Sequence, residues 1–260
     1  MDLGLAGKVA LVTGSSRGIG AGIAEGLATE GCDIMLTGRD EAALKEVAAA
    51  VAKRGRKAQY STLDLADPKA PAALVADLKK HFGKLDILVN NAGATKRGDF
   101  RELTDADWKD GFELKFFAHV RMSREAWPLL VASKGSVVTI AGIGGKEPEA
   151  EFGIGSSVNA ACTAWTKALA DVGKKEGVQV NTVHPGRVET ERLWRRIRVR
   201  VKDSGDSEAK VREEFREEFN ITRFGLVGDI AGLIAFMASP HGRWLHGATI
   251  DMDGGEVRGI

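Results

Sequence analysis

The chain has 260 residues, with 37 basic and 36 acidic side chains and a formal net charge of +1, a balance that gives no reason to expect nucleic acid or a membrane surface as a partner. No apolar run approaches the roughly 20 residues of a membrane span, and the amino terminus lacks the basic flank of a signal sequence. The two cysteines, Cys32 and Cys162, have no metal-type spacing, so we expect no metal site and a reducing, cytoplasmic setting.

Short apolar runs alternate with longer segments of helical periodicity along the whole chain. In chain order the sequence predicts strand 8–13, helix 21–29, strand 33–37, helix 40–54, strand 58–63, helix 70–82, strand 85–89, helix 105–132, strand 136–140, helix 157–175, strand 178–184, helix 229–238 and strand 248–252. Near-continuous apolar strands joined by helices indicate a parallel sheet that is covered on both faces. The pattern predicts an α/β fold with a Rossmann-type, doubly wound, mostly parallel seven-stranded sheet.

No shift in composition marks a domain boundary, so we expect residues 1–260 to form a single domain. The segment 192–219 is highly charged and is predicted to be an insertion on the substrate side of the core. Within it, residues 208–218 have the acidic and basic mixture of an exposed helix, and we expect nothing more of them.

A glycine-rich loop follows the first predicted strand and leads into the first predicted helix. It reads Thr13-Gly14-Ser15-Ser16-Arg17-Gly18-Ile19-Gly20. Glycines here permit a tight turn and a close approach of backbone to a pyrophosphate, and the helix directs its first N–H groups to the phosphates. The alternative is an ordinary cluster of turn glycines. The position between a strand and a helix favours a dinucleotide site formed by Gly14, Ser16, Arg17, Gly18, Ile19 and Gly20.

Further motifs stand at the carboxyl ends of predicted strands, where ligands bind in open α/β sheets. They are Asp64-Leu65, Asn90-Asn91-Ala92-Gly93, Pro185-Gly186 and Asp251-Met252-Asp253-Gly254-Gly255. With the glycine loop, these motifs resemble the short-chain dehydrogenase/reductase family over essentially the whole chain.

The resemblance implies roles for the residues in these motifs. It places Asp64 and Leu65 against the adenine, and the backbone of Asn91, Ala92 and Gly93 along the adenosine ribose. The segment after Pro185 and Gly186 meets the nicotinamide, here through Val188 and Thr190. The resemblance also implies a small-molecule substrate and a homo-oligomer, either a tetramer or a dimer, that pairs through helices 105–132 and 157–175.

The end of the second predicted strand bears on the choice of cofactor. A carboxylate there would bind a 2′-hydroxyl and repel a 2′-phosphate, but this chain has Gly38 followed by Arg39. Arg17 adds a second guanidinium, and Asp40 is expected to cap the next helix. The sequence therefore predicts NADP(H), with NAD(H) less favoured, unless both arginines only solvate the surface.

The catalytic residues that the family resemblance implies are missing. Alignment on the strand 136–140 and the helix tail 165–170 places the family's serine at Gly142, its tyrosine at Gly155 and its lysine at Asn159. Its asparagine falls at Lys115. The only tyrosine of the chain is Tyr60, in the third predicted strand, and Phe152 near the expected position has no ionisable group.

The asparagine and lysine of the family thus stand in exchanged positions, as Lys115 and Asn159. We assign these two residues as the candidate catalytic pair, because the Lys115 ammonium would reach the nicotinamide ribose from the neighbouring helix. The alternative is that Lys115 is a solvated helix residue and Asn159 a packing residue.

Other side chains near the site are weaker candidates. His184 is a possible proton donor, although a bond to backbone is the expected role. Ser156 and Ser157 are expected to cap a helix. Several arginines at the mouth of the site would suit an anionic substrate, or would form a solvated helix face: Arg187, Arg192, Arg195 and Arg196.

Two functions of different class fit these observations. The first is an NADP(H)-dependent oxidoreductase that transfers hydride to or from a small molecule with a non-standard proton donor. The second is a catalytically silent relative that binds a nucleotide or metabolite as a sensor or partner subunit. The missing tyrosine favours the second for ordinary ketones, but it leaves hydride transfer to an activated substrate open.

Overall fold

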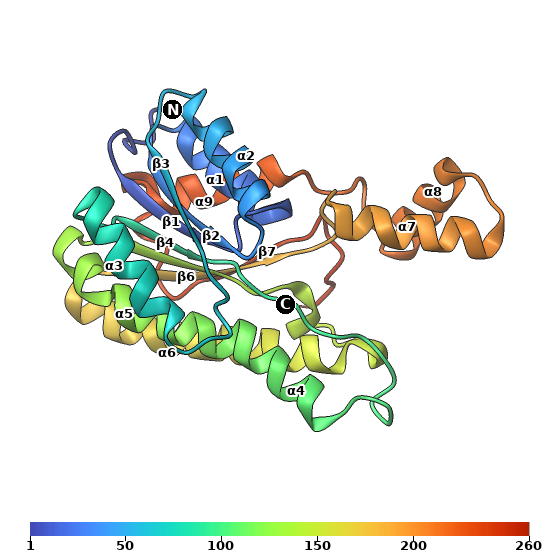
Figure 1. Cartoon of the computed structure of the whole chain (residues 1–260). Coiled ribbons are helices and arrows are strands. Elements are labelled where there is room, and N and C mark those ends of the chain that lie inside the picture. Colours follow the sequence, from blue (N-terminus) through green and yellow to red (C-terminus); the bar gives the residue numbers. More distant parts are fainter. Residues whose placement is uncertain (260) are drawn as a thin grey trace.

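The computed structural model describes residues 1–259, which build one seven-stranded sheet with helices on both faces (Figure 1). The strands are β1 (Val9–Thr13), β2 (Asp33–Gly38), β3 (Ala58–Thr62), β4 (Ile87–Asn90), β5 (Ser136–Ile140), β6 (Gln179–Pro185) and β7 (Thr249–Met252). Their order is β3-β2-β1-β4-β5-β6-β7, and each neighbouring pair is parallel. The predicted Rossmann-type, doubly wound sheet is confirmed.

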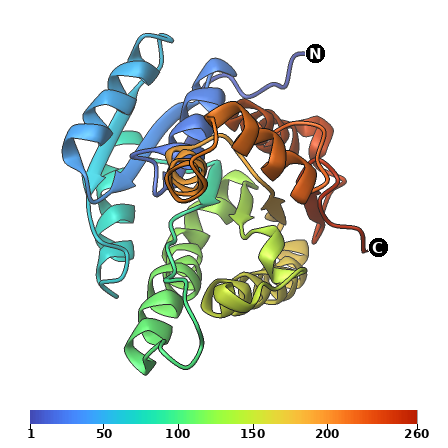
Figure 2. The same cartoon turned by 90° about the vertical axis from the view of Figure 1, so that its right-hand side faces the viewer.

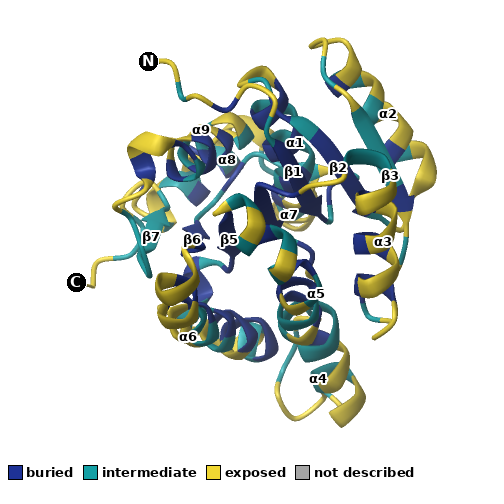
Figure 3. Ribbon diagram, turned by 90° about the vertical axis from the view of Figure 1, so that its left-hand side faces the viewer, coloured by how far each residue is buried: buried dark blue, intermediate teal, exposed yellow. Residues whose placement is uncertain are grey.

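Two layers of helices enclose the sheet. One layer contains α1 (Gly18–Thr29), α2 (Glu41–Ala52) and α9 (Val227–Ala238), and the other contains α3 (Ala70–Phe82), α5 (Ala118–Ser133) and α6 (Gly153–Glu176) (Figures 1 and 3). Successive side chains of β1 point to opposite faces of the sheet: Ala10 and Val12 pack against the α1 layer, and Leu11 packs against the α3 layer. This double burial is the reason for the continuous apolar runs in the sequence.

Several helices and strands begin at residues other than those predicted from the sequence. Helix α1 begins at Gly18 instead of residue 21, α6 begins at Gly153 instead of residue 157, and β4 begins at Ile87 instead of residue 85. The predicted helix 105–132 is a succession of α4 (Asp105–Gly111), a π-helical turn η1 (Phe112–Phe117) and α5. Three short 3₁₀ turns complete the helical segments: η2 (Ile143–Gly145), η3 (Ala150–Phe152) and η4 (Pro240–Gly242).

The charged segment forms a helical hairpin that projects from the carboxyl-end edge of the sheet (Figures 1 and 2). It consists of α7 (Glu191–Ser204) and α8 (Glu208–Glu218). The predicted charged helix over 208–218 is confirmed as α8, although its apolar residues Val211 and Phe215 are buried in a small cluster between the two helices. None of the helices within residues 1–259 is long and apolar enough to cross a membrane.

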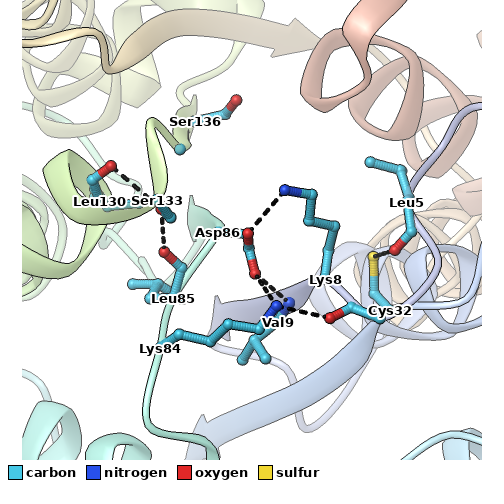
Figure 4. Close-up of polar contacts among 12 residues, drawn as sticks. Leu5, Lys8, Val9, Cys32, Lys84, Leu85, Asp86, Leu130, Ser133 and Ser136 are labelled. Atoms are coloured by element: carbon cyan, nitrogen blue, oxygen red, sulfur yellow. Dashed lines mark hydrogen bonds and ion pairs between the residues drawn. The ribbon is translucent and has the colours of Figure 1, made fainter.

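One buried residue, Asp86, joins three strands at the opposite, amino-end edge through its carboxylate and its backbone carbonyl (Figure 4). Asp86 precedes β4, and its Oδ2 accepts a 2.9 Å hydrogen bond from the Val9 backbone N–H. Its carboxylate also contacts the ammonium groups of Lys8 at 3.0 Å and Lys84 at 3.2 Å. The backbone N–H of Ser136 donates to the Asp86 carbonyl at 2.9 Å. One residue therefore aligns the starts of β1, β4 and β5.

We predict that Asp86→Ala lowers the free energy of unfolding by about 1–3 kcal/mol, because the buried Val9 N–H loses its acceptor. The two lysines are half exposed and contribute little of this loss. Urea unfolding measures the effect, with Asp110→Ala on the exposed face of α4 as the control. Equal stability of the two variants would contradict the proposed structural role of Asp86.

Candidate functional site

The glycine loop packs directly on the turn that follows β4, at the carboxyl-end edge seen in Figure 2. A Cβ on Gly14 would lie 2.8 Å from the Cα of Ala92, and Gly14 has a positive φ of 64°. A Cβ on Gly20 would lie 2.5 Å from the Asn91 side-chain nitrogen. Both glycines are therefore required for the contact between the two motifs.

The amino end of α1 has the chemistry of a phosphate site. The residue at its N-cap position, Arg17, makes no side-chain capping bond, and the first turn contains no acidic residue. The N–H groups of Gly18 and Ile19, at the positive end of the helix dipole, are therefore uncapped. The Arg17 guanidinium is exposed beside them. These residues fit the phosphates of a dinucleotide.

Thr13, at the end of β1, fixes the turn after β4, and the sequence analysis did not assign it this role. Its hydroxyl accepts hydrogen bonds from the backbone N–H groups of Asn91 at 2.9 Å and Ala92 at 3.0 Å. The Asn91 side-chain nitrogen donates in return to the Thr13 carbonyl at 2.9 Å. Its position as the last strand residue before the glycine loop is the only sequence signal for this role.

The expected adenosine end lies at the tips of β2 and β3. A Cβ on Gly38 would lie 3.2 Å from the Ser16 hydroxyl, so Ser16 of the glycine loop already fills the space beside Gly38. Arg39 and Asp64 are exposed, with 3.6 Å between their nearest side-chain nitrogen and oxygen. Leu65 is buried in the core. The structure thus brings Arg39 and the Asp64-Leu65 motif to the same edge as the glycine loop.

The expected nicotinamide end follows β6, which ends at Pro185. A Cβ on Gly186 would lie 2.6 Å from backbone of the segment after β7, so this position also requires glycine. Val188 is buried. The Thr190 methyl group lies 3.7 Å from the Cβ position of Gly18, which brings this segment against the glycine loop.

Lys115 and Asn159 meet at the carboxyl end of β5. The Lys115 ammonium, carried by the π-helical turn η1, donates to Asn159 Oδ1 at 2.6 Å and to the Ala141 carbonyl at 2.7 Å. A Cβ on Gly93 would lie 2.7 Å from Lys115 Cδ, and one on Gly142 would lie 3.0 Å from Asn159 Nδ2. The two glycines therefore leave room for the lysine and the asparagine. The structure does not place Lys115 on a solvated face.

Burial, with a smaller contribution from the positive charge of Arg192, lowers the pKa of Lys115 to about 8. The ammonium has two neutral oxygen partners and no carboxylate partner within residues 1–259. A lysine with such a pKa exchanges its proton readily near neutral pH. Single-turn π-helices such as η1 often occur at functional sites, and the sequence pattern did not reveal this one.

A buried histidine and a buried cysteine connect the turn after β4 with helix α6. His119 Nε2 lies 2.8 Å from the Ala92 carbonyl, so it carries the proton and donates it. The other ring nitrogen then accepts from the Cys162 thiol, which lies 3.8 Å away. Burial lowers the pKa of His119 to about 3, so the ring is neutral. The spacing of four residues from Lys115 is the sequence signal that could have identified His119.

An aromatic ring covers the position where the family resemblance places a tyrosine. A Cβ on Gly155 would lie 2.1 Å from the ring of Phe152. The Arg97 guanidinium stacks on this ring, 4.1 Å from its centroid. Tyr60 lies in β3, at the far edge of the sheet from β5.

Two minor expectations are wrong. Neither Ser156 nor Ser157 caps α6, because the helix begins at Gly153; the Ser156 hydroxyl is buried without a hydrogen-bond partner among the described residues. His184 contacts side chains and not backbone. Its ring nitrogens lie 2.8 Å from the Thr163 hydroxyl and 3.1 Å from Asp251 Oδ1.

Known proteins are similar to this chain over nearly its whole length. The 3-oxoacyl-[acyl-carrier-protein] reductase of Salmonella typhimurium is 30% identical over 250 residues, which cover 96% of this chain and 97% of that protein. The crystal structure of L-sorbose reductase from Gluconobacter frateurii, complexed with NADPH and L-sorbose, has a TM-score of 0.96 and 32% identity, with full coverage of both chains.

A short-chain dehydrogenase from Burkholderia cenocepacia, in complex with NADP, has a TM-score of 0.86 and 33% identity and covers 97% of this chain and 98% of that one. The short chain dehydrogenase family model matches residues 8–199. From its sheet order, its glycine loop and these matches, the chain belongs to the short-chain dehydrogenase family.

Proposed function

We propose that this protein is an NADP(H)-dependent oxidoreductase in which Lys115, positioned by Asn159, exchanges the proton at the reacting oxygen. The observation that carries the proposal is the Lys115 ammonium, which lies 2.6 Å from Asn159 Oδ1 and 2.7 Å from the Ala141 carbonyl. It supports a non-standard proton donor beside the expected nicotinamide position. The family membership supports the general oxidoreductase role.

The residues at the carboxyl-end edge suit the cofactor. The uncapped first turn of α1 suits the pyrophosphate, while Arg17 and Arg39 suit a 2′-phosphate, with no acid at Gly38. Two structural neighbours were solved with NADPH or NADP. The bound nicotinamide would supply or accept the hydride, and the protein would control the proton and the orientation of the substrate.

Lys115 has the properties of a general acid. Two of its three N–H groups are held by Asn159 and Ala141, so the third is available to a substrate oxygen. A pKa of about 8 keeps the group mainly protonated at neutral pH and still allows it to release the proton. In the reverse direction the neutral amine would accept the proton from an alcohol.

His184 is the weaker candidate for this role. Both ring nitrogens contact side chains, Thr163 on one side and Asp251 on the other. Burial also lowers the pKa of His184, which reduces its protonated fraction at neutral pH. These contacts favour a structural role between α6 and β7.

A silent nucleotide-binding protein is the competing proposal, and the Phe152 ring over Gly155 favours it. NADPH oxidation with a broad panel of carbonyl compounds, L-sorbose included, separates the two. Turnover of any compound that depends on Lys115 supports the oxidoreductase. Tight NADPH binding without turnover of any compound supports the silent protein.

We predict that the protein binds NADPH at least about ten-fold more tightly than NADH, because charged hydrogen bonds to the 2′-phosphate are worth about 1.5–3 kcal/mol. Arg39→Asp should remove most of this preference by placing a carboxylate near the phosphate. Calorimetry measures both affinities. The control is Lys53→Asp, the same charge change at the far end of α2. Equal affinities in the wild type would refute the assignment.

We also predict that carbonyl reduction slows as the pH rises through about 8, because Lys115 must be protonated to donate. Alcohol oxidation should accelerate over the same range. Lys115→Met should lower the rate by about 10²–10⁴-fold and abolish this pH dependence, whereas Lys109→Met on the exposed face of α4 should change neither. An unchanged pH profile in Lys115→Met would exclude Lys115 as the donor.

A further inference from the structure

One carboxylate on β7 joins two segments that approach Asn159 from different sides. Asp251 Oδ2 accepts a 2.6 Å hydrogen bond from the Lys146 ammonium, and Asp251 Oδ1 lies 3.1 Å from His184 Nδ1. Lys146 directly follows the 3₁₀ turn η2, and His184 lies near the end of β6, where it is the register partner of Asp251. The carboxylate therefore links β6, β7 and the segment after β5.

The first arm runs from Lys146 through η2 to Asn159. The Lys146 backbone N–H donates to the Ile143 carbonyl at 2.8 Å, which closes the turn. A Cβ on Gly145 would lie 3.0 Å from Asn159 Cβ and 2.9 Å from the Ala160 nitrogen, so η2 packs directly on α6 at this point. Lys146 thus tethers to β7 the end of a turn that rests on Asn159.

The second arm runs from His184 through Thr163 to the same residue. His184 is 1% exposed, and its Nε2 lies 2.8 Å from the Thr163 hydroxyl oxygen, which is 2.9 Å from the Asn159 carbonyl oxygen. Because a carboxylate only accepts, Asp251 keeps the proton of the neutral ring on Nδ1 and leaves Nε2 as an acceptor. The Thr163 proton then serves either Nε2 or the carbonyl. Both contacts keep Thr163 between β6 and the Asn159 turn of α6.

The two arms converge on the groups that hold the Lys115 ammonium. Asn159 Oδ1 accepts from this ammonium at 2.6 Å. The Ala141 carbonyl accepts at 2.7 Å, and the chain runs from Ala141 through Gly142 into η2. Both acceptors therefore belong to segments that the carboxylate on β7 ties down. A reacting group keeps its geometry when the partners that hold it are themselves fixed by hydrogen bonds.

We infer that Asp251 is a positioning residue for Lys115, and that it acts through Lys146 on one side and through His184 and Thr163 on the other. The inference rests on the proposed function of Lys115 and deepens it, because it names the groups that keep both acceptors at the ammonium. Without the Asp251 carboxylate, η2 should loosen from α6 and water should reach the ammonium.

NMR of the full chain with ¹³C-labelled lysine tests this role without requiring turnover. The signal that is missing from Lys115→Met identifies the Lys115 ε-carbon, and its titration in the wild type should have a midpoint of about 8. In Asp251→Ala the midpoint should rise toward the ordinary lysine value of about 10.4, because water then solvates the ammonium. Loss of a negative charge alone would lower the midpoint, so the direction of the change separates positioning from electrostatics.

Variants that break one arm each test the two paths. Thr163→Val, which changes no charge, and Lys146→Met should each raise the midpoint by less than Asp251→Ala does, and their combination should match Asp251→Ala. Lys146→Arg keeps the ion pair and should retain the wild-type midpoint. The matched control is Glu147→Ala, which removes a neighbouring carboxylate that accepts from the Arg258 backbone N–H, and it should not raise the midpoint.

Three results would overturn the inference: a wild-type midpoint at the ordinary lysine value, an Asp251→Ala midpoint equal to that of the wild type, or an Asp251→Ala midpoint below it. Circular dichroism checks that each variant is folded. Should Asp251→Ala fail to fold, an unchanged midpoint in Thr163→Val would overturn the inference instead.

NADPH oxidation with the same panel of carbonyl compounds separates this inference from the proposed function. The expected rise of the midpoint in Asp251→Ala, without turnover of any compound by the wild type, would retain the positioning role and refute the reductase. Turnover that depends on Lys115, with the same pH profile in Asp251→Ala as in the wild type, would retain the reductase and refute the positioning role.

Discussion

The candidate site depends on one half-buried ammonium group that is held by two neutral oxygens. Lys115 reaches from the π-helical turn η1 to Asn159 on α6 and to the Ala141 carbonyl after β5, so it links three elements. Gly93 and Gly142 lack the Cβ atoms that would displace the lysine and the asparagine. Lys115 and Asn159 are therefore accommodated by the backbone on which they pack, and not merely tolerated at a surface.

The same contact sets the electrostatics of the site. A lysine without a carboxylate partner is costly to bury, and the cost appears as a lowered pKa. Arg192 adds to this effect, while Glu149 and Glu256 remain bound to Arg97 and Arg187. A lysine with this lowered pKa suits proton donation at neutral pH.

Much of the fold could be predicted from local sequence, because both faces of each central strand are buried and the glycine loop has few backbone solutions. The N-cap role of Asp40 was predicted in the same way and is confirmed by its 3.1 Å bond from the Ala43 N–H. Other features depend on contacts distant in sequence. The π-helical turn has no local signature, and α6 begins among glycines that predict a loop.

The site shows the same division between local and distant information. The sequence alone singled out Lys115 and Asn159 and predicted Gly155 at the position where the family resemblance places a tyrosine. The ion pairs of Glu149 and the apolar contact between α7 and α8 required the fold, because each joins segments that are separate in the sequence. Sequence position thus indicated which groups are unusual, and the structure showed which of them meet.

A double-mutant cycle on NADPH affinity tests the exchange of Lys115 and Asn159 most directly. The account predicts that Lys115→Asn and Asn159→Lys each weaken binding, the first by removing the ammonium and the second by placing two ammonium groups together. The combined variant should bind about ten-fold more tightly than either single variant, because it restores one lysine and one amide. Losses that simply add in the combined variant would show that the two residues act independently and would contradict the account.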